Sequence, residues 1–346
     1  MSGGWRRRRA TRRAAGAAAS VVAVMVLATA VAVVAGLAVT VPSTGAAPVT
    51  VPSTDAAPVT VPSTGVVTVS AHKLLAVGAE NEYANVIAQV GGRYVRATAI
   101  MSNPNTDPHT FEVSPSAAQE VASAALVVQN GLGYDSFMER IEAAASDPGR
   151  RVIDVRRLLH RPKSTPNPHL WYDPSTMPAV AKAIARDLSA LEPAHRTYFE
   201  ANAARFDRSL APWRRAIAAL RRRFPGAPVA TTEPVADYLL QAAGLRNMTP
   251  FAFQADVMNG VDPSPQDVAV EQGLLREHRV RAFVYNVQVT DTLTASLLAI
   301  ARAAHVPVVG VYETMPTPGF DYQRWMLAEV SALQRALADG KSATRL

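Results

Sequence analysis

The chain has 346 residues, 49% of them hydrophobic, which is enough for two ordinary domains with well-filled cores. Its net charge of +7 is uneven, because six arginines lie within the first 13 residues and residues 61–346 carry only +2. The nearly neutral folded part gives no indication of a nucleic-acid partner, and the lack of cysteine excludes disulfides, thiolate ligands and a lipid-modified N-terminal Cys.

The first 66 residues differ in composition from the rest. The arginines are followed by an uncharged run, 14–41, that is dominated by Ala and Val. This pattern predicts an exported protein, with residues 1–41 acting either as a signal peptide or as an uncleaved membrane anchor. Residues 41–65 contain two and a half copies of a decapeptide, VPSTGAAPVT and then VPSTDAAPVT, and residues 42–66 are predicted to form an extended Pro/Ser/Thr linker. We therefore expect an extracytoplasmic protein, either secreted or held at the cell surface by its N-terminal segment.

Strand-like and helix-like segments alternate through residues 67–192. Apolar, β-rich runs predict strands at 72–77, 94–100, 125–129 and 152–155, and helical patterns cover 80–90, 114–124 and 174–191. Such alternation is typical of a parallel sheet covered on both faces, so this segment is predicted to be an N-terminal α/β lobe.

The most regular pattern lies at 193–224. Apolar residues recur there at spacings of four and three, which predicts one long amphipathic helix. They are Phe199, Ala203, Phe206, Leu210, Trp213, Ile217, Leu220 and Phe224. Pro212 lacks a backbone donor and is expected to kink the helix. A coiled-coil dimerisation helix is the alternative; in this α/β context, with only about four heptads, we expect packing on the chain's own lobes and a monomer.

After this helix the alternation resumes through 225–346. Strands are predicted at 229–232, 282–285 and 308–312, and helices at 234–243, 265–277, 293–304 and 322–338. The fold class is therefore α/β, with two parallel-sheet lobes bridged by one long rigid helix and a cleft between the lobes.

Two similar loops carry histidines. Asp107-Pro108-His109 and Asn167-Pro168-His169 both place a proline directly before the imidazole, and an aromatic residue follows within two positions. Proline restricts its own backbone and that of its predecessor, so each ring sits on a stiffened loop. A neutral imidazole that is already ordered is a good metal ligand.

Two carboxylates follow predicted strands of the C-terminal lobe. Glu233 ends the 229–232 strand and Glu313 ends the 308–312 strand. Ligands of parallel α/β sheets bind outside the carboxyl ends of the strands, where His109 and His169 are also expected. Two imidazoles and two carboxylates form a plausible site for a divalent metal, although their spacing matches no local metal motif.

Several short motifs occur in the order in which they occur in one protein family. They are Ala79-Glu80-Asn81-Glu82-Tyr83, Asp107-Pro108-His109-Thr110-Phe111-Glu112, Asn167-Pro168-His169-Leu170-Trp171, Thr232-Glu233-Pro234, Tyr285-Asn286-Val287-Gln288 and Glu313-Thr314-Met315-Pro316. Between about residues 69 and 337 the chain resembles the extracytoplasmic substrate-binding proteins of manganese, zinc and iron ABC transporters. The resemblance implies two α/β lobes bridged by a long helix, and metal ligands at His109, His169, Glu233 and Glu313.

The resemblance also bears on the choice of metal. The third ligand of the family is often His in zinc carriers and Glu in manganese or iron carriers, so Glu233 favours Mn²⁺ over Zn²⁺. Glu313 replaces the usual Asp, which leaves its coordination mode open. The His-rich loop of many zinc carriers is missing between residues 140 and 167. Glu112 is a candidate to hold the His109 ring, or equally an acid near a helix N-terminus.

The implied function is binding, not catalysis. The protein would capture Mn²⁺ or Zn²⁺ as cargo and deliver it to an ABC permease and its ATPase. A metal-dependent hydrolase, with Glu112 or Glu313 as base, is an alternative, and so is a surface adhesin with a structural metal.

Overall fold

The computed structural model describes residues 73–105 and 111–346. The predicted signal or anchor, the repeat linker and His109 lie outside these residues. The described residues belong to one compact unit, Val67–Leu346. None of the helices among them is long and apolar enough to cross a membrane.

The N-terminal lobe is built on a four-stranded parallel sheet in the order β2-β1-β3-β4. Its strands are β1 (Leu74–Glu80), β2 (Val95–Met101), β3 (Leu126–Gln129) and β4 (Arg151–Asp154). Successive side chains point to opposite faces, so Ala76 lies in one core and Val77 in another. The central strands β1 and β3 are therefore buried on both sides for most of their length, as expected for a parallel sheet, whereas the edge strands β2 and β4 are partly exposed.

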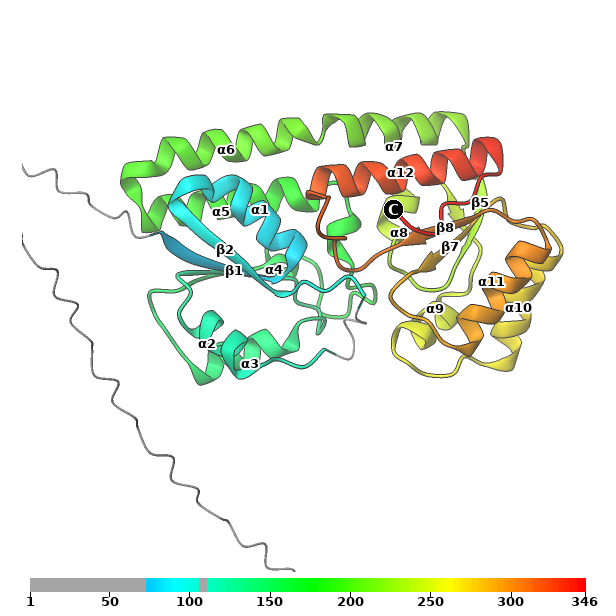
Figure 1. The fold of residues 1–346 in the computed structure, drawn as a ribbon, viewed down its shortest axis with the longest axis horizontal. Helices are drawn as coiled ribbons and strands as arrows, with labels where there is room; N and C mark the ends of the chain where they lie inside the picture. Colours follow the sequence, from blue (N-terminus) through cyan, green and yellow to red (C-terminus); the bar gives the residue numbers. More distant parts are fainter. Residues whose placement is uncertain (1–72, 106–110) are drawn as a thin grey trace, which may run out of the picture. The chain divides into compact units, whose positions relative to one another are not determined.

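Helices cover both faces of this sheet (Figure 1). One side carries α1 (Asn81–Gly91) and α5 (Thr176–Leu191), and the other carries α2 (Pro115–Ala122) and α3 (Ser136–Ala144). The short helices η1 (Gly92–Tyr94), α4 (Val155–Leu158), η3 (Leu170–Tyr172) and η4 (Pro193–His195) lie in the connections. Ser114 caps α2 by accepting a hydrogen bond from the Ala117 amide, and Pro115 occupies the first helical position, as the sequence predicts.

The C-terminal lobe repeats the plan with the strand order β6-β5-β7-β8. Its strands are β5 (Pro228–Thr231), β6 (Arg246–Asn247), β7 (Phe283–Asn286) and β8 (Val308–Val311). Its helices are α8 (Asp237–Ala242), α9 (Phe251–Met258), α10 (Pro265–Arg276), α11 (Thr292–Ala303) and α12 (Tyr322–Asp339). The order places β7 between the two strands that precede Glu233 and Glu313. The predicted α/β class with two parallel-sheet lobes is confirmed.

The predicted bridging helix is present but interrupted. It consists of α6 (Arg196–Ser209) and α7 (Ala211–Arg223), which meet at Leu210. Leu210 keeps right-handed helical backbone angles, and Pro212 lies in the first turn of α7. The break therefore falls just before the proline that was expected to kink the helix, because the proline nitrogen has no hydrogen to donate. In Figure 1 the α6–α7 pair runs along both lobes.

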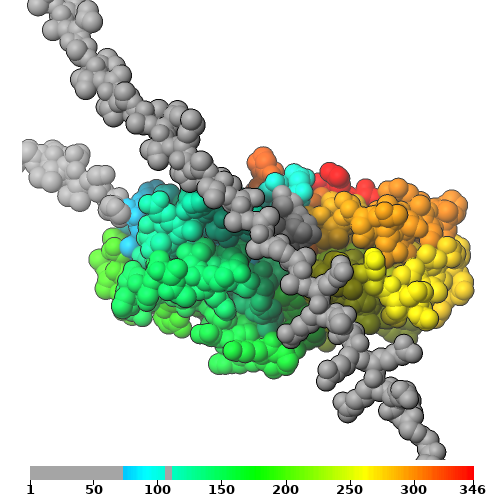
Figure 2. All heavy atoms as spheres, turned by 90° about the horizontal axis from the view of Figure 1, so that it is seen from below, coloured from blue at the N-terminus to red at the C-terminus, as the bar shows by residue number. Residues whose placement is uncertain are grey.

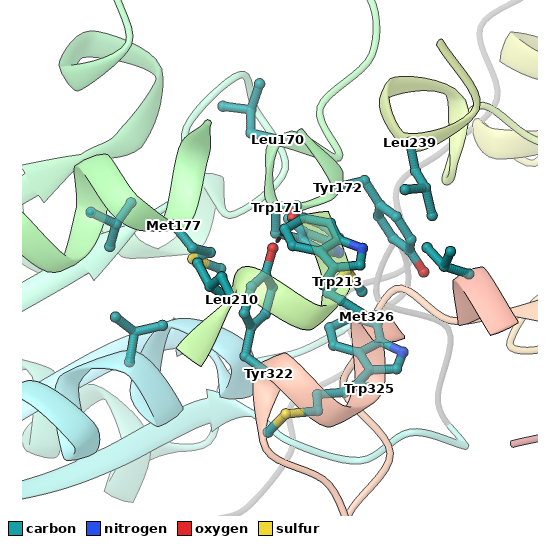
Figure 3. Close-up of a cluster of buried hydrophobic side chains, with 14 of the residues drawn as sticks. Leu170, Trp171, Tyr172, Met177, Leu210, Trp213, Leu239, Tyr322, Trp325 and Met326 are labelled. Atoms are coloured by element: carbon teal, nitrogen blue, oxygen red, sulfur yellow. Dashed lines mark hydrogen bonds between the residues drawn. The ribbon is translucent and has the colours of Figure 1, made fainter. Parts of the chain in front are cut away.

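A single hydrophobic core lies beneath this pair and joins the lobes. It includes Val86 of α1, Val284 of β7 and Leu333 of α12, all at most 2% exposed. At its centre, side chains from η3, α5, α7, α8 and α12 pack together (Figure 3). The labelled residues are Leu170, Trp171, Tyr172, Met177, Leu210, Trp213, Leu239, Tyr322, Trp325 and Met326. Smaller cores fill the opposite face of each sheet.

Helix α12 forms a second connection between the lobes. Its first residue, Tyr322, donates its amide hydrogen to the Asn85 side chain of α1, 3.1 Å away. Gln323 and Gln89 exchange side-chain hydrogen bonds of 2.7 and 2.9 Å. The lobes are thus tied by α12 as well as by α6 and α7. Figure 2 shows the described unit from the side away from α6 and α7. The N-terminal lobe, coloured mostly green, lies at one end, and the C-terminal lobe, coloured yellow to orange, lies at the other.

Candidate metal centre

Three of the four predicted donors lie at the junction of the lobes and are almost fully buried. Glu233 and Glu313 follow the carboxyl ends of β5 and β8, and His169 directly precedes η3. Their exposed fractions are 3%, 0% and 0%. The fourth, His109, lies outside the described residues, and Glu112, which was predicted to support it, is exposed.

Asn167 fixes the ring of His169. The side-chain oxygen of Asn167 lies 2.8 Å from Nδ1 of His169 and accepts a hydrogen bond from its amide at 3.0 Å. The orientation of the Asn167 amide is determined, because its nitrogen donates to the Pro234 carbonyl at 2.7 Å. The ring therefore carries its hydrogen on Nδ1, and Nε2 is the nitrogen with the lone pair suited to a metal.

Nε2 of His169 lies 3.1 Å from Oε2 of Glu313, with both side chains fully buried. In this tautomer both atoms are acceptors, so the contact is favourable only when a proton or a cation lies between them.

Asn286 links the two carboxylates. It is the last residue of β7, and its side-chain nitrogen donates to Oε1 of Glu313 at 2.6 Å and to Oε1 of Glu233 at 3.1 Å. Its oxygen accepts from the Gln288 amide at 3.0 Å, which fixes the direction of the side chain. One amide therefore orients both acidic groups.

Two further polar side chains hold Glu313. The hydroxyl of Tyr134 donates to Oε2 at 2.9 Å, across the junction of the lobes. Burial raises the pKa of Tyr134 well above its usual value, so the hydroxyl stays a donor. The side-chain oxygen of Gln288 accepts from the backbone amides of Glu313 and Thr314 at 2.7 and 2.8 Å.

Sequence reasoning identified neither the contact of Tyr134 nor that of Asn286. Both residues were nevertheless detectable by the criterion that selected the glutamates, since Asn286 ends β7 and Tyr134 lies in the loop after β3. A tyrosine and an amide at these positions carry no charge, so a search for charged or metal-ligating groups does not find them.

Two more carboxyl groups, Glu80 and Glu82, are buried at the junction of β1 and α1. Burial raises the pKa of both well above the ordinary value, and the charge of Glu313 adds to the shift at Glu82. Both shifts disfavour the charged form of these two carboxyl groups.

The described residues do not complete a coordination shell. Within residues 73–105 and 111–346, no three His, Asp or Glu side chains form a group that could hold a metal ion. A hollow of about 980 Å³, lined by Gln129, Glu142, Asp154 and Arg156 among others, includes none of the predicted donors. The cluster therefore consists of the His169 imidazole in contact with the Glu313 carboxylate, and of the Glu233 carboxylate, which the Asn286 side-chain amide links to Glu313.

Comparisons with known proteins agree with this fold. Residues 77–336 match the family ZnuA, described as the periplasmic component A of the zinc-uptake complex. The manganese ABC transporter substrate-binding lipoprotein PsaA of Streptococcus pneumoniae is 21% identical over 255 residues, 70% of this chain and 80% of that protein. The metal ABC transporter substrate-binding lipoprotein SloC of Streptococcus mutans is 21% identical over 233 residues, 63% and 74% of the two chains.

Solved structures show the same architecture. FpvC of Pseudomonas aeruginosa, in complex with Mn²⁺, superimposes with a TM-score of 0.63 at 21% identity, covering 77% of this chain and 98% of that one. The Mn-bound periplasmic metal-binding protein of Candidatus Liberibacter asiaticus gives 0.62 at 17% identity, covering 77% and 100%. The family match spans residues 77–336, most of this chain. The chain therefore belongs to the ZnuA family of periplasmic metal-binding proteins, the substrate-binding components of ABC transporters.

Proposed function

We propose that this protein captures one divalent transition-metal ion outside the cytoplasm and delivers it to an ABC permease, with Mn²⁺ favoured over Zn²⁺ as cargo. The observation that supports the proposal is the contact of the oriented His169 ring with Glu313 at the junction of the lobes, together with the Asn286 amide that joins Glu313 to Glu233. His109, on the loop after β2, is the fourth donor that we assign to it.

The donor set supports the choice of metal. Carboxylate oxygens suit Mn²⁺, whereas thiolate ligands, which this chain lacks, favour softer ions. PsaA is named as a manganese transport protein, and FpvC was crystallised with Mn²⁺ and with Ni²⁺. Two anionic ligands also neutralise a divalent ion, which makes its burial less costly.

We propose that the working partners are a membrane permease and its ATPase, and that the carrier itself is a monomer. PsaA and SloC are named as lipoproteins, but this chain has no cysteine to carry a lipid. Attachment to the membrane, if it is retained, then falls to the apolar segment at 14–41.

The proposal is tested by titrating the metal-free protein with Mn²⁺ and with Zn²⁺ in a calorimeter. Wild type should bind one equivalent, and His109→Ala and His169→Ala should each lose tight binding of that equivalent. His305→Asn is the control, because His305 is exposed at the end of α11 and Asn tolerates its positive φ of 52°. Unchanged stoichiometry and affinity in both alanine variants would contradict the assigned site.

A further inference from the structure

The cluster contains one side chain that touches both carboxylates without being a metal ligand. The side-chain nitrogen of Asn286 has two hydrogens, and its two acceptors, Glu233 and Glu313, follow the ends of two different strands, β5 and β8. The strand order explains this position, because β7 lies between β5 and β8. Asn286 is 1% exposed, so water does not compete for these bonds.

Asn286 is itself held on two sides. Its backbone amide donates to the Thr232 hydroxyl at 3.0 Å, beside Glu233, and its side-chain oxygen accepts from the Gln288 amide at 3.0 Å. Gln288 in turn binds the backbone amide of Glu313. The amide of Asn286 is therefore a fixed spacer, and the two carboxylates are positioned against it and not only by their own backbones.

We propose that Asn286 is the residue that sets the metal preference of this site, by keeping Glu233 and Glu313 at the separation that suits the larger, oxygen-rich coordination of Mn²⁺. This inference rests on the proposed function. Intrinsic affinities of N/O sites for divalent metals rise from Mn²⁺ towards the later metals, so a preference for Mn²⁺ depends on geometry. Zn²⁺ prefers four ligands at about 2.0–2.2 Å and draws carboxylates inward. A spacer that resists this movement disfavours Zn²⁺ relative to Mn²⁺.

Removal of the spacer then has different consequences for the two metals. Without the amide, the bonds that hold the two carboxylates apart are lost, so the carboxylates can approach a small ion more closely. The affinity for Mn²⁺ falls because the preformed separation of the carboxylates is lost. The affinity for Zn²⁺ falls less, because the carboxylates can now move inward to the shorter distances that Zn²⁺ prefers. If Asn286 only stabilised the fold, its substitution would lower the affinities for Mn²⁺ and Zn²⁺ by the same factor.

The test is the ratio of the Zn²⁺ and Mn²⁺ dissociation constants, measured by competition titration with full-length Asn286→Leu and Asn286→Ala. Leu keeps most of the volume and removes both donors, and Ala removes the side chain beyond Cβ. Asn202→Ala is the control, because Asn202 is also buried (4% exposed) and donates to the Val90 carbonyl at 3.0 Å, in the packing of α6 on α1. Urea denaturation of each variant shows whether it is folded.

We expect Mn²⁺ affinity to fall about 10–100-fold in the Asn286 variants, the range typical for groups that support metal ligands, and Zn²⁺ affinity to fall by about tenfold less. Asn202→Ala should leave the ratio unchanged. Equal losses for both metals, or no loss in a folded Asn286→Leu protein, would overturn the role of Asn286 while leaving the proposed function intact. Failure of the wild type to bind either metal would overturn the proposed function and this inference together.

Discussion

Tyr134 donates its hydroxyl to the same Glu313 oxygen that lies beside His169. Tyr134→Phe removes this donor and changes little else in volume, so Glu313 loses one of the bonds that orient it. We expect metal affinity to fall about tenfold, measured by calorimetry, with the fold preserved. Tyr94→Phe is the control, since its hydroxyl bonds only to Arg93 in an exposed pair. Equal affinities for both variants and wild type would show that Tyr134 does not position the carboxylate.

Glu271 offers a separate test of buried charge. It is 0% exposed, and burial raises its pKa from 4.5 to about 8. Between these values the folded protein binds this proton and the unfolded chain does not, so the stability that it contributes is full below about pH 4.5 and is lost as the pH rises through 8.

Glu271→Gln removes this titration. The difference in unfolding free energy between wild type and variant, measured by urea denaturation of the metal-free proteins, should fall by up to about 1.4 kcal/mol per pH unit between about pH 5 and 8. Glu277→Gln, on an exposed residue just after the same helix, should show no such trend. Parallel profiles for wild type and Glu271→Gln would refute the shift.

At the scale of single residues, the sequence indicated candidate donors, which as a metal site stay a prediction, but it did not indicate the side chains that hold them. Proline before His169 and the strand-end position of Glu313 are local signals, readable in one stretch of chain. The bonds from Asn286 and Tyr134 join residues 27 and 179 positions apart, so they exist only after the sheets and lobes have formed.

Among the elements, β8 illustrates how an edge strand is protected. The segment after α12 lies along it in parallel, with hydrogen bonds of 2.8 and 2.9 Å between Ala343 and the backbone of Val308 and Gly310. A Cβ at Gly310 would collide with the Thr344 carbonyl. The terminal segment thus covers an edge that would otherwise offer unpaired backbone groups, and it steadies the strand that leads to Glu313.

Gly310→Ala should therefore lower the unfolding free energy by about 1–3 kcal/mol, because backbone must shift to admit the methyl group. Gly273→Ala is the matched control: it lies inside α10, where a Cβ meets only Glu277 at 3.8 Å, and alanine should stabilise the helix by about 0.5–1 kcal/mol. Chemical denaturation measures the unfolding free energy of each variant and shows whether it falls for Gly310→Ala and rises for Gly273→Ala. A neutral or stabilising Gly310→Ala would mean that the terminal segment does not pack on β8.

Element boundaries follow local chemistry closely where caps are strong. Ser114-Pro115 begins α2 and Pro225-Gly226 follows the end of α7. The sequence prediction omitted α3 and α9. The segment of α9 is short and mostly apolar, and its apolar residues have no helical period. Helix α3 begins after a glycine-rich turn at 131–133 that is typical of a loop.

At the scale of the described unit, hydrogen bonds cross the junction at several points. The Asn81 side chain exchanges two bonds with the backbone of Met315, at 2.8 and 2.9 Å. Tyr172 donates to the Tyr312 carbonyl at 2.7 Å, and both contact the buried carboxyl of Glu329. These contacts lie within two or three residues of Glu313 and His169, so a movement of the lobes would disturb the donors directly.

We therefore expect small motion on loading. X-ray scattering of the metal-free and metal-loaded protein should give radii of gyration that agree within about 1 Å, as for other preformed binding sites. The same measurement on Asn81→Leu, which lacks both bonds to Met315, shows whether these contacts limit the motion. A compaction of several ångströms in wild type would indicate hinged lobes that close on the ion.

The class of fold was predictable because strand and helix periods alternate cleanly, and because the apolar pattern of 193–224 is long. The shared core beneath α6 and α7 and the second bridge through α12 were not predictable. They depend on which face of each helix packs against which lobe. The hydrophobic period of a sequence shows that a helix has an apolar face, but not which element packs against that face.

The central claim is that side chains far apart in sequence surround one cation at the junction of the lobes. Anomalous scattering at the manganese edge from crystals of the Mn²⁺-loaded protein locates that cation directly. We predict a single strong peak within ligand distance of Nε2 of His169 and of carboxylate oxygens of Glu233 and Glu313, with His109 completing the shell. A manganese peak at another place in the molecule, with His169 still at hydrogen-bond distance from Glu313, would contradict the proposed site.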